Sequence, residues 1–228
     1  MQTGGGFGNA IVGTLLTVGI ASLLSIPFGI LAGVYLAEIG PETKVAKIVR
    51  FTAKILTGFP SILAGVFAYG SVVLLTGGYS ALAGGVALSI LMLPIVMLTA
   101  EEAIRMVPAK MREAAIGMGA TQTQTVWKIL LPTAIPGILT GVMLSVARAA
   151  GETAPLLFTA LFSNYWPWTN GKLELMQPTS SLAVLIYNFS GMPFDNLVEM
   201  AWAAALVLVI IVLILNLTGQ SLSRKSVR

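Results

Sequence analysis

The sequence predicts an all-α membrane protein in which about five helices span the bilayer. Of its 228 residues, 56% are hydrophobic and only 10% are charged, and the mean hydropathy is +0.90. A soluble domain carries about 25% charged residues, so most of this surface is not suited to water. The length suits one domain over residues 1–228, because each span takes about 20 apolar residues.

Long stretches without charged side chains predict where the spans lie. No charged side chain occurs before Glu38, and none occurs between Ile55 and Ala100. A turn at Gly77 and Gly78 divides the second stretch into two helices. The predicted spans are therefore about 9–37, 55–76, 80–101, 134–162 and 199–221.

The basic residues predict the orientation of the chain, because cytoplasmic loops are enriched in Lys and Arg. Eleven of the thirteen basic residues fall on one side of the five-span topology: Lys44, Lys47, Arg50, Lys54, Arg105, Lys110, Arg112, Lys128, Arg224, Lys225 and Arg228. Lys172 falls on the other side, and Arg148 lies within a span. We therefore expect the N-terminus outside, the C-terminus in the cytoplasm and the segment 102–132 on the cytoplasmic side.

Two further patterns bear on packing. Gly29-x-x-x-Gly33 and Gly137-x-x-x-Gly141 place small residues on one helix face, which favours close helix approach. The stretch 181–189 is apolar but too short to span. It is interpreted either as a re-entrant or interfacial helix or as a surface helix packed on the bundle.

Missing residue types exclude several functions. The chain has no Cys and no His, which excludes disulfides, His-ligated metals and a Ser-His or Cys-His nucleophile. Asp195 is the single Asp, so a paired-Asp intramembrane protease is excluded as well. No phosphate-cradling P-loop motif occurs. We expect no catalytic residue, no metal ligand and no cofactor in this chain.

The cytoplasmic segment 108–132 reads as two helices joined by a glycine bend. Pro108 suits a first helical turn, and good helix formers follow it up to Ile116. Two glycines then break the helix. Thr121 and Gln124 form a capping-box pattern that starts the second helix. One interpretation of such a segment is an amphipathic helix at the membrane interface, with Glu113 exposed to water.

The spacing in residues 113–132 resembles the EAA motif of ABC importer permeases. The positions that match are Glu113, Ala114, Ala115, Gly119, Ile129, Leu131 and Pro132. The resemblance implies a type I ABC importer (MetI-like) permease fold, in which this segment is a coupling helix docked on an ATPase subunit. It also implies that ATP and Mg are bound by the partner ATPase subunits. Small side chains permit close docking, and Glu113 adds one orienting charge.

Arg148 and Glu152 are the unusual residues of the fourth predicted span. A charge at the bilayer centre costs about 2.5–3.5 kcal/mol on insertion scales. The two side chains are four residues apart on one helix face, so they can pair. One interpretation is a buried salt bridge with no further role. An intramembrane ionisable residue is more often part of a site or pathway, and arginine suits oxyanions. Gly151 and Pro155 indicate a bend beside Glu152.

The stretch RAAGETAPLLFTA, residues 148–160, resembles the phosphate-specific (Pst-type) ABC permeases, particularly their A subunit, and residues 4–15 resemble them too. The resemblance implies a second related permease subunit, two ATPase subunits and a periplasmic phosphate-binding protein in a bacterial inner membrane. It places Arg148 and Glu152 on the translocation pathway. Lipid is the other expected partner, and nucleic acid is not one. Another oxyanion as cargo, or a passive anion channel, stays open as an alternative.

Overall fold

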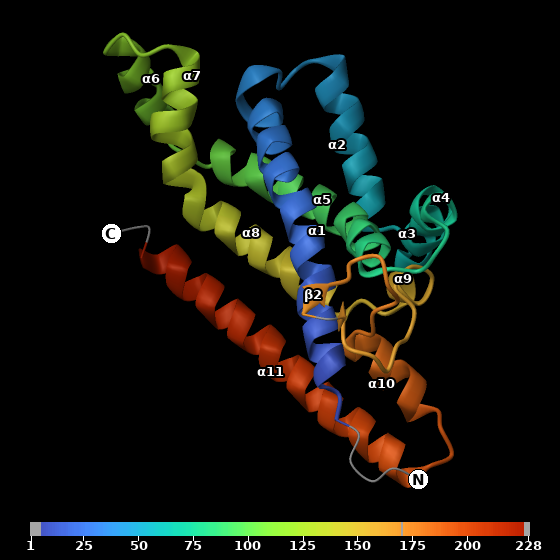
Figure 1. Ribbon diagram of the computed structural model, residues 1–228. Helices are drawn as coiled ribbons and strands as arrows, with labels where there is room; N and C mark the ends of the chain where they lie inside the picture. The colour runs from blue at the N-terminus through green and yellow to red at the C-terminus, as the bar shows by residue number, and fades with distance from the viewer. Residues whose placement is uncertain (1–5, 170, 226–228) are drawn as a thin grey trace. The chain divides into compact units, whose positions relative to one another are not determined.

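The structure, a computed structural model, describes residues 6–169 and 171–225 (Figure 1). Within that part the regular elements are helices, apart from two short strands, β1 (Trp168–Thr169) and β2 (Lys172–Leu173), which pair antiparallel. The predicted all-α class is therefore confirmed. The chain forms two compact units. Unit 1 holds the residues up to Leu24, Phe59–Leu91 and Val146–Ile214, and unit 2 holds Ser25–Gly58, Met92–Ser145 and the residues from Leu215 on.

Among the described residues, four helical segments are long and apolar enough to cross a membrane. They are α1 (Gly8–Val34) with the π-helical turn η1 (Tyr35–Ile39), α5 (Ala81–Arg105), α8 (Leu131–Gly151) with the preceding α7 (Gln122–Thr125) and the π-helical turn η3 (Val126–Leu130), and α11 (Asp195–Lys225). A bent pair of helices passes the same test together, so the described residues hold four spans, or the expected five when this pair is counted as one span. The orientation of the termini stays a prediction.

The bent pair differs from the predicted second span at 55–76. α2 (Lys44–Thr57) already includes residue 55 and ends before Gly58. A separate helical segment follows the break and comprises α3 (Ser61–Ala68), the π-helical turn η2 (Tyr69–Val73) and α4 (Leu74–Thr76). Pro60 explains the break, because a proline drives the preceding residue out of the helical region. The sequence did not predict this break, because the residues around it are uncharged and mostly apolar.

A core in unit 1 joins α1, α10 (Leu182–Ser190) and α11. Its buried residues are Ala10, Leu182, Leu185 and Ala204. The side chain of Ser181 caps α10 at its N-terminus, and the hydroxyl of Thr14 accepts a hydrogen bond of 2.8 Å from the Leu182 amide. The expected short helix at 181–189 is thus present. It packs on α1 and α11, as the second interpretation proposed.

Gly13 gives this part of unit 1 a sharp stability test. A Cβ at Gly13 would lie 1.9 Å from the carbonyl oxygen of Ser180, and a backbone atom cannot move aside as a side chain tip can. We expect Gly13→Ala to lower the free energy of unfolding by about 1–3 kcal/mol, in the range of overpacked cores. Thermal unfolding in detergent measures it. Gly19→Ala is the control on the same helix, because nothing lies within 4 Å of its Cβ position. Equal unfolding temperatures for the two variants would contradict the packing described.

Unit 2 is packed through glycines on both sides of α5. Cβ atoms at Gly29 and Gly33 on α1 would lie within 3.0 Å of α5 side chains, and Cβ atoms at Gly137 and Gly141 on α8 would do so as well. Both glycine motifs therefore serve close helix packing, as predicted. A second buried cluster joins η1, α2 and α5 through Leu36, Ala46, Ala53 and Met97.

Candidate translocation and coupling sites

Arg148 and Glu152 form the ion pair that their spacing predicted. Arg148 lies in the last turn of α8, and its Nε donates a hydrogen bond of 3.3 Å to Oε1 of Glu152. The exposed fraction is 40% for the Arg148 side chain and 16% for that of Glu152. In the described part of the chain, the terminal nitrogens of Arg148 have no hydrogen bond and remain as donors. The pair is therefore accessible in this chain and can rearrange.

Glu152 lies at a break between two helices. α8 ends at Gly151, and α9 (Ala154–Leu157) begins two residues after Glu152. Pro155 explains the break, because a proline ring clashes with the carbonyl four residues earlier, here that of Gly151. The predicted span at 134–162 thus differs from the structure. The continuous helical segment runs from Gln122 to Gly151.

Backbone groups beyond the break find partners inside unit 1. The carbonyl of Thr159 accepts from the amide of Ser80 at 2.9 Å, and that of Ala160 accepts from the amide of Thr179 at 3.0 Å. α9 also packs closely on α3, since a Cβ at Gly65 would lie 2.7 Å from Pro155 Cα. Irregular backbone at membrane depth needs such internal satisfaction. The break beside Glu152 is therefore stabilised by hydrogen bonds and packing within unit 1.

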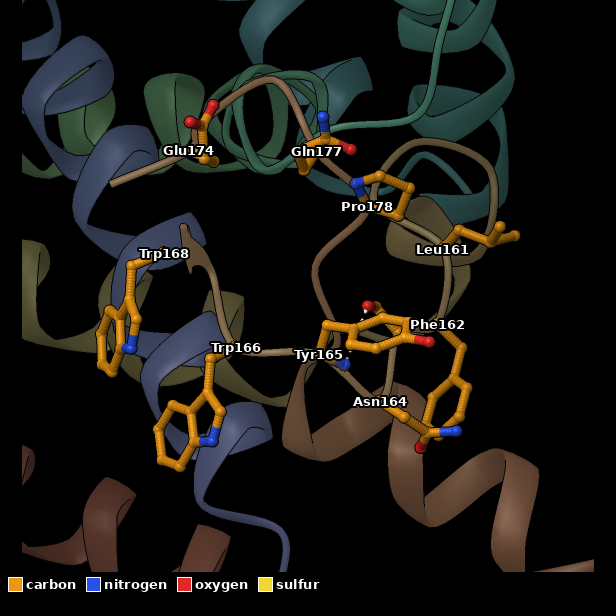
Figure 2. Close-up of a pocket in the computed structure, with 10 residues that line it drawn as sticks. Leu161, Phe162, Asn164, Tyr165, Trp166, Trp168, Glu174, Gln177 and Pro178 are labelled. Atoms are coloured by element: carbon orange, nitrogen blue, oxygen red, sulfur yellow. Dashed lines mark hydrogen bonds between the residues drawn. The ribbon is translucent and has the colours of Figure 1, made fainter. Parts of the chain in front are cut away.

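A cavity of about 880 Å³ lies in the segment that joins α9 to α10, and sequence reasoning did not find it. Its lining includes Phe162, Tyr165, Trp166, Trp168 and Glu174. Figure 2 shows the two indole rings side by side; their centroids are 5.1 Å apart. Arg148 and Glu152 do not line this cavity. The only signal in the sequence was the Trp- and Pro-rich composition of this loop.

The segment 109–125 has the predicted internal structure. α6 (Ala109–Gly117) and α7 form a hairpin (Figure 1). Gly119 between them has a φ of +86°, a conformation that glycine adopts without strain. The side chains of Thr121 and Gln124 both make their capping-box hydrogen bonds. The predicted helix, glycine bend and capped second helix are all confirmed.

The seven motif positions are divided between surface and interior. Glu113, Ala114, Gly119 and Pro132 are exposed, Ile129 and Leu131 are half-buried, and Ala115 is buried. The exposed members lie on α6, on the bend and at the start of α8, where a partner can reach them. The buried Ala115 instead serves packing within the chain.

Residues 25–228 match the family of binding-protein-dependent transport system inner membrane components. The chain belongs to this family. It is therefore a multi-pass membrane permease subunit of an ABC transporter, a class that works with ATPase and binding-protein partners. The resemblance seen in the EAA spacing is confirmed at the level of the family.

Several phosphate transport permeases are similar to this permease over most of its length. The permease is 41% identical over 219 residues to the phosphate transport system permease protein PstA of Xylella fastidiosa strain 9a5c, covering 96% of this chain and 75% of the relative. It is 42% identical over 213 residues to PstA of Haemophilus influenzae, covering 93% and 74%. A probable PstA of Methanocaldococcus jannaschii is 39% identical over 211 residues, covering 92% and 73%.

Solved structures support the fold. A chain in an inward-facing structure of the MetNI methionine ABC transporter superposes with a TM-score of 0.76 at 21% identity, covering 98% of the permease and 95% of that chain. A chain of an amino acid ABC transporter crystallised with histidines gives 0.67 at 16% identity, covering 95% and 92%. The predicted type I importer fold is thus confirmed.

Proposed function

We propose that this permease passes inorganic phosphate across a bacterial inner membrane, using ATP that partner subunits hydrolyse. The relatives that match almost the whole chain are phosphate transport permeases. The observation in the structure that supports this cargo is the Arg148–Glu152 pair, an accessible arginine at the end of an apolar helix. No other basic side chain lies in the stretch from Ile129 to Gly171.

Arginine suits a tetrahedral oxyanion for a chemical reason. Its guanidinium is permanently charged and presents several N–H donors in a planar fork that matches phosphate oxygens. Glu152 accepts from only one of these nitrogens at 3.3 Å, which leaves the others for an anion. We infer that Arg148 attracts phosphate when the site opens. Glu152 holds Arg148 between turnovers and keeps phosphate from binding too tightly.

The proposal includes a division of labour with partner proteins. A periplasmic binding protein delivers phosphate, a second related permease subunit completes the membrane part, and two ATPase subunits bind ATP and Mg on the cytoplasmic face. The coupling segment then meets the ATPase through the exposed motif residues Glu113 and Ala114 of α6. This arrangement has the N-terminus outside and the C-terminus inside.

The test of the function is phosphate uptake by the reconstituted transporter. Proteoliposomes would contain this permease, its partner permease and the ATPase, with the binding protein added outside. We expect uptake of labelled phosphate only with ATP, and no competition from excess sulfate. Uptake that ignores ATP would indicate a passive anion channel. ATP-driven sulfate uptake without phosphate uptake would indicate an ATP-driven importer whose substrate is sulfate.

A further inference from the structure

Glu38 connects the cytoplasmic hairpin to the end of the first helix. It lies in η1, and its side chain is only 8% exposed although it is ionisable. Both of its carboxylate oxygens accept hydrogen bonds from Arg112 of α6, one of them from Nε at 3.1 Å. The side chain of Gln122, the first residue of α7, donates to the Glu38 carbonyl at 2.9 Å. Both arms of the hairpin are thus attached to one residue.

The other side of η1 is fixed to α2 and α5. The amide of Gly40 bonds to the Tyr35 carbonyl in the π-helical pattern, and Pro41 has no N–H to offer the next carbonyl, that of Leu36. Two arginines use this carbonyl instead. Nη2 of Arg50 donates to it at 2.7 Å, and Nη2 of Arg105 at 3.4 Å.

Glu101 joins the same two arginines. Its side chain is 8% exposed and accepts a hydrogen bond from Nε of Arg50 at 2.7 Å, and it forms an ion pair with Arg105, whose Nη2 lies 2.9 Å away. The third nitrogen of Arg50 donates to the Pro41 carbonyl at 2.8 Å. Each of the three guanidinium nitrogens of Arg50 on α2 therefore donates a hydrogen bond, one to α5 and two to η1 and the turn that follows it. All these residues belong to unit 2.

Breaking such a network from one side is costly. Removing one partner of a buried charge pair leaves the other charge uncompensated, whereas the pair itself adds little net stability. Stability alone therefore explains the network poorly. What it does provide is a rigid connection, since bidentate arginine–carboxylate pairs fix orientation as well as distance.

We propose that Glu38 is a positioning residue that transmits movement of the coupling hairpin to the membrane helices. Arg112 and Gln122 link the hairpin to η1, and Arg50, Arg105 and Glu101 link η1 to α2 and α5. On the same helix, Arg112 faces Glu38, while Glu113 is exposed to a partner. This inference rests on the proposed role of the hairpin in coupling, and it adds the residues that carry the movement onward.

Charge reversal in the complete reconstituted transporter tests the inference. We expect Glu38→Arg and Arg112→Glu each to leave assembly and basal ATP hydrolysis in place and to lower phosphate uptake per ATP about tenfold, within the usual range of coupling effects. The double variant restores the pair with its charges exchanged. It should return uptake per ATP to within about threefold of the unmodified transporter.

Matched controls make the same changes outside the network. Lys44→Glu makes the same kind of charge change as Arg112→Glu at an exposed position of α2, outside the hairpin and the network. Glu42→Arg matches Glu38→Arg at a carboxylate that is 86% exposed. Both controls should keep uptake per ATP unchanged. If a reversal prevents assembly, Glu38→Gln keeps the side-chain shape, and we expect it to lower the ratio about fivefold.

Three outcomes would overturn the inference: unchanged uptake per ATP in the single variants, a parallel loss of assembly and hydrolysis with an unchanged ratio, or a double variant no better than the single ones. A wrong assignment of the cargo gives a different result, because the unmodified transporter would then hydrolyse ATP without importing phosphate. In that case the variants are compared by how much the binding protein stimulates their ATP hydrolysis. Its loss on reversal and return in the double variant would support the role of Glu38.

Discussion

Replacing Arg148 with alanine is expected to lower ATP-driven phosphate uptake about 100-fold while the transporter still assembles. Each hydrogen bond to a charged group contributes about 1.5–3 kcal/mol, so losing the guanidinium removes one to two powers of ten in phosphate binding. Assembly should survive because the Arg148 side chain is 40% exposed and its single ion pair is with a neighbour on the same chain segment. Labelled-phosphate uptake into proteoliposomes and size-exclusion chromatography of the complex measure the two effects.

Two further variants separate the anion-binding role of Arg148 from a general effect of charge. Arg148→Lys keeps the charge but loses the planar fork, so uptake should fall by about tenfold instead. Glu152→Gln removes the competitor for Arg148, so phosphate should bind more tightly and leave more slowly, which lowers both KM and the maximal rate. Uptake by Arg148→Ala at the unmodified rate would show that the ion pair has no part in transport.

Replacing Glu113 with lysine should uncouple ATP hydrolysis from transport. Glu113 is exposed on α6 next to the exposed Ala114, where its carboxylate can orient the docked ATPase. Reversing its charge should reduce uptake about 30-fold, in the range of measured coupling energies. ATP hydrolysis by the assembled complex should lose its stimulation by the binding protein. Parallel measurements of uptake and hydrolysis provide the test.

The control for this change is Glu102→Lys, at an exposed position near the end of α5. It makes the same charge reversal outside the hairpin, and we expect uptake to stay within about twofold of the unmodified transporter. Unchanged ATPase docking and transport in Glu113→Lys would contradict a coupling role for this residue. The motif match would then reflect packing alone.

Local signals in the sequence were sufficient for several parts of the structure. The charge-free stretches gave the long helices, and the capping-box residues Thr121 and Gln124 marked the start of the second hairpin helix. The spacing of Arg148 and Glu152 predicted their pairing. These features depend on residues within one or two helical turns of each other, so composition and spacing are enough to predict them.

Helix ends within apolar runs were harder to place. Pro60 and Pro155 each interrupt a stretch that reads as one continuous span, and hydropathy does not register a missing N–H or a ring that clashes with a carbonyl. Gly151 and Pro155 predicted a bend, but the helix stops at Gly151 instead of continuing to residue 162. Backbone sterics therefore set these ends.

By itself, the sequence determined the membrane class, the long helices, the hairpin of α6 and α7 and the Arg148–Glu152 pair, because periodicity, charge and turn chemistry are local. Only the tertiary structure decided which distant residues meet. Glu38 and Arg112 are 74 residues apart, and Arg50 and Glu101 are 51 apart. A buried carboxylate must be paired, but the sequence offers thirteen basic residues and no sign of which one pairs with it. Packing of α1, α2 and α5 makes that choice.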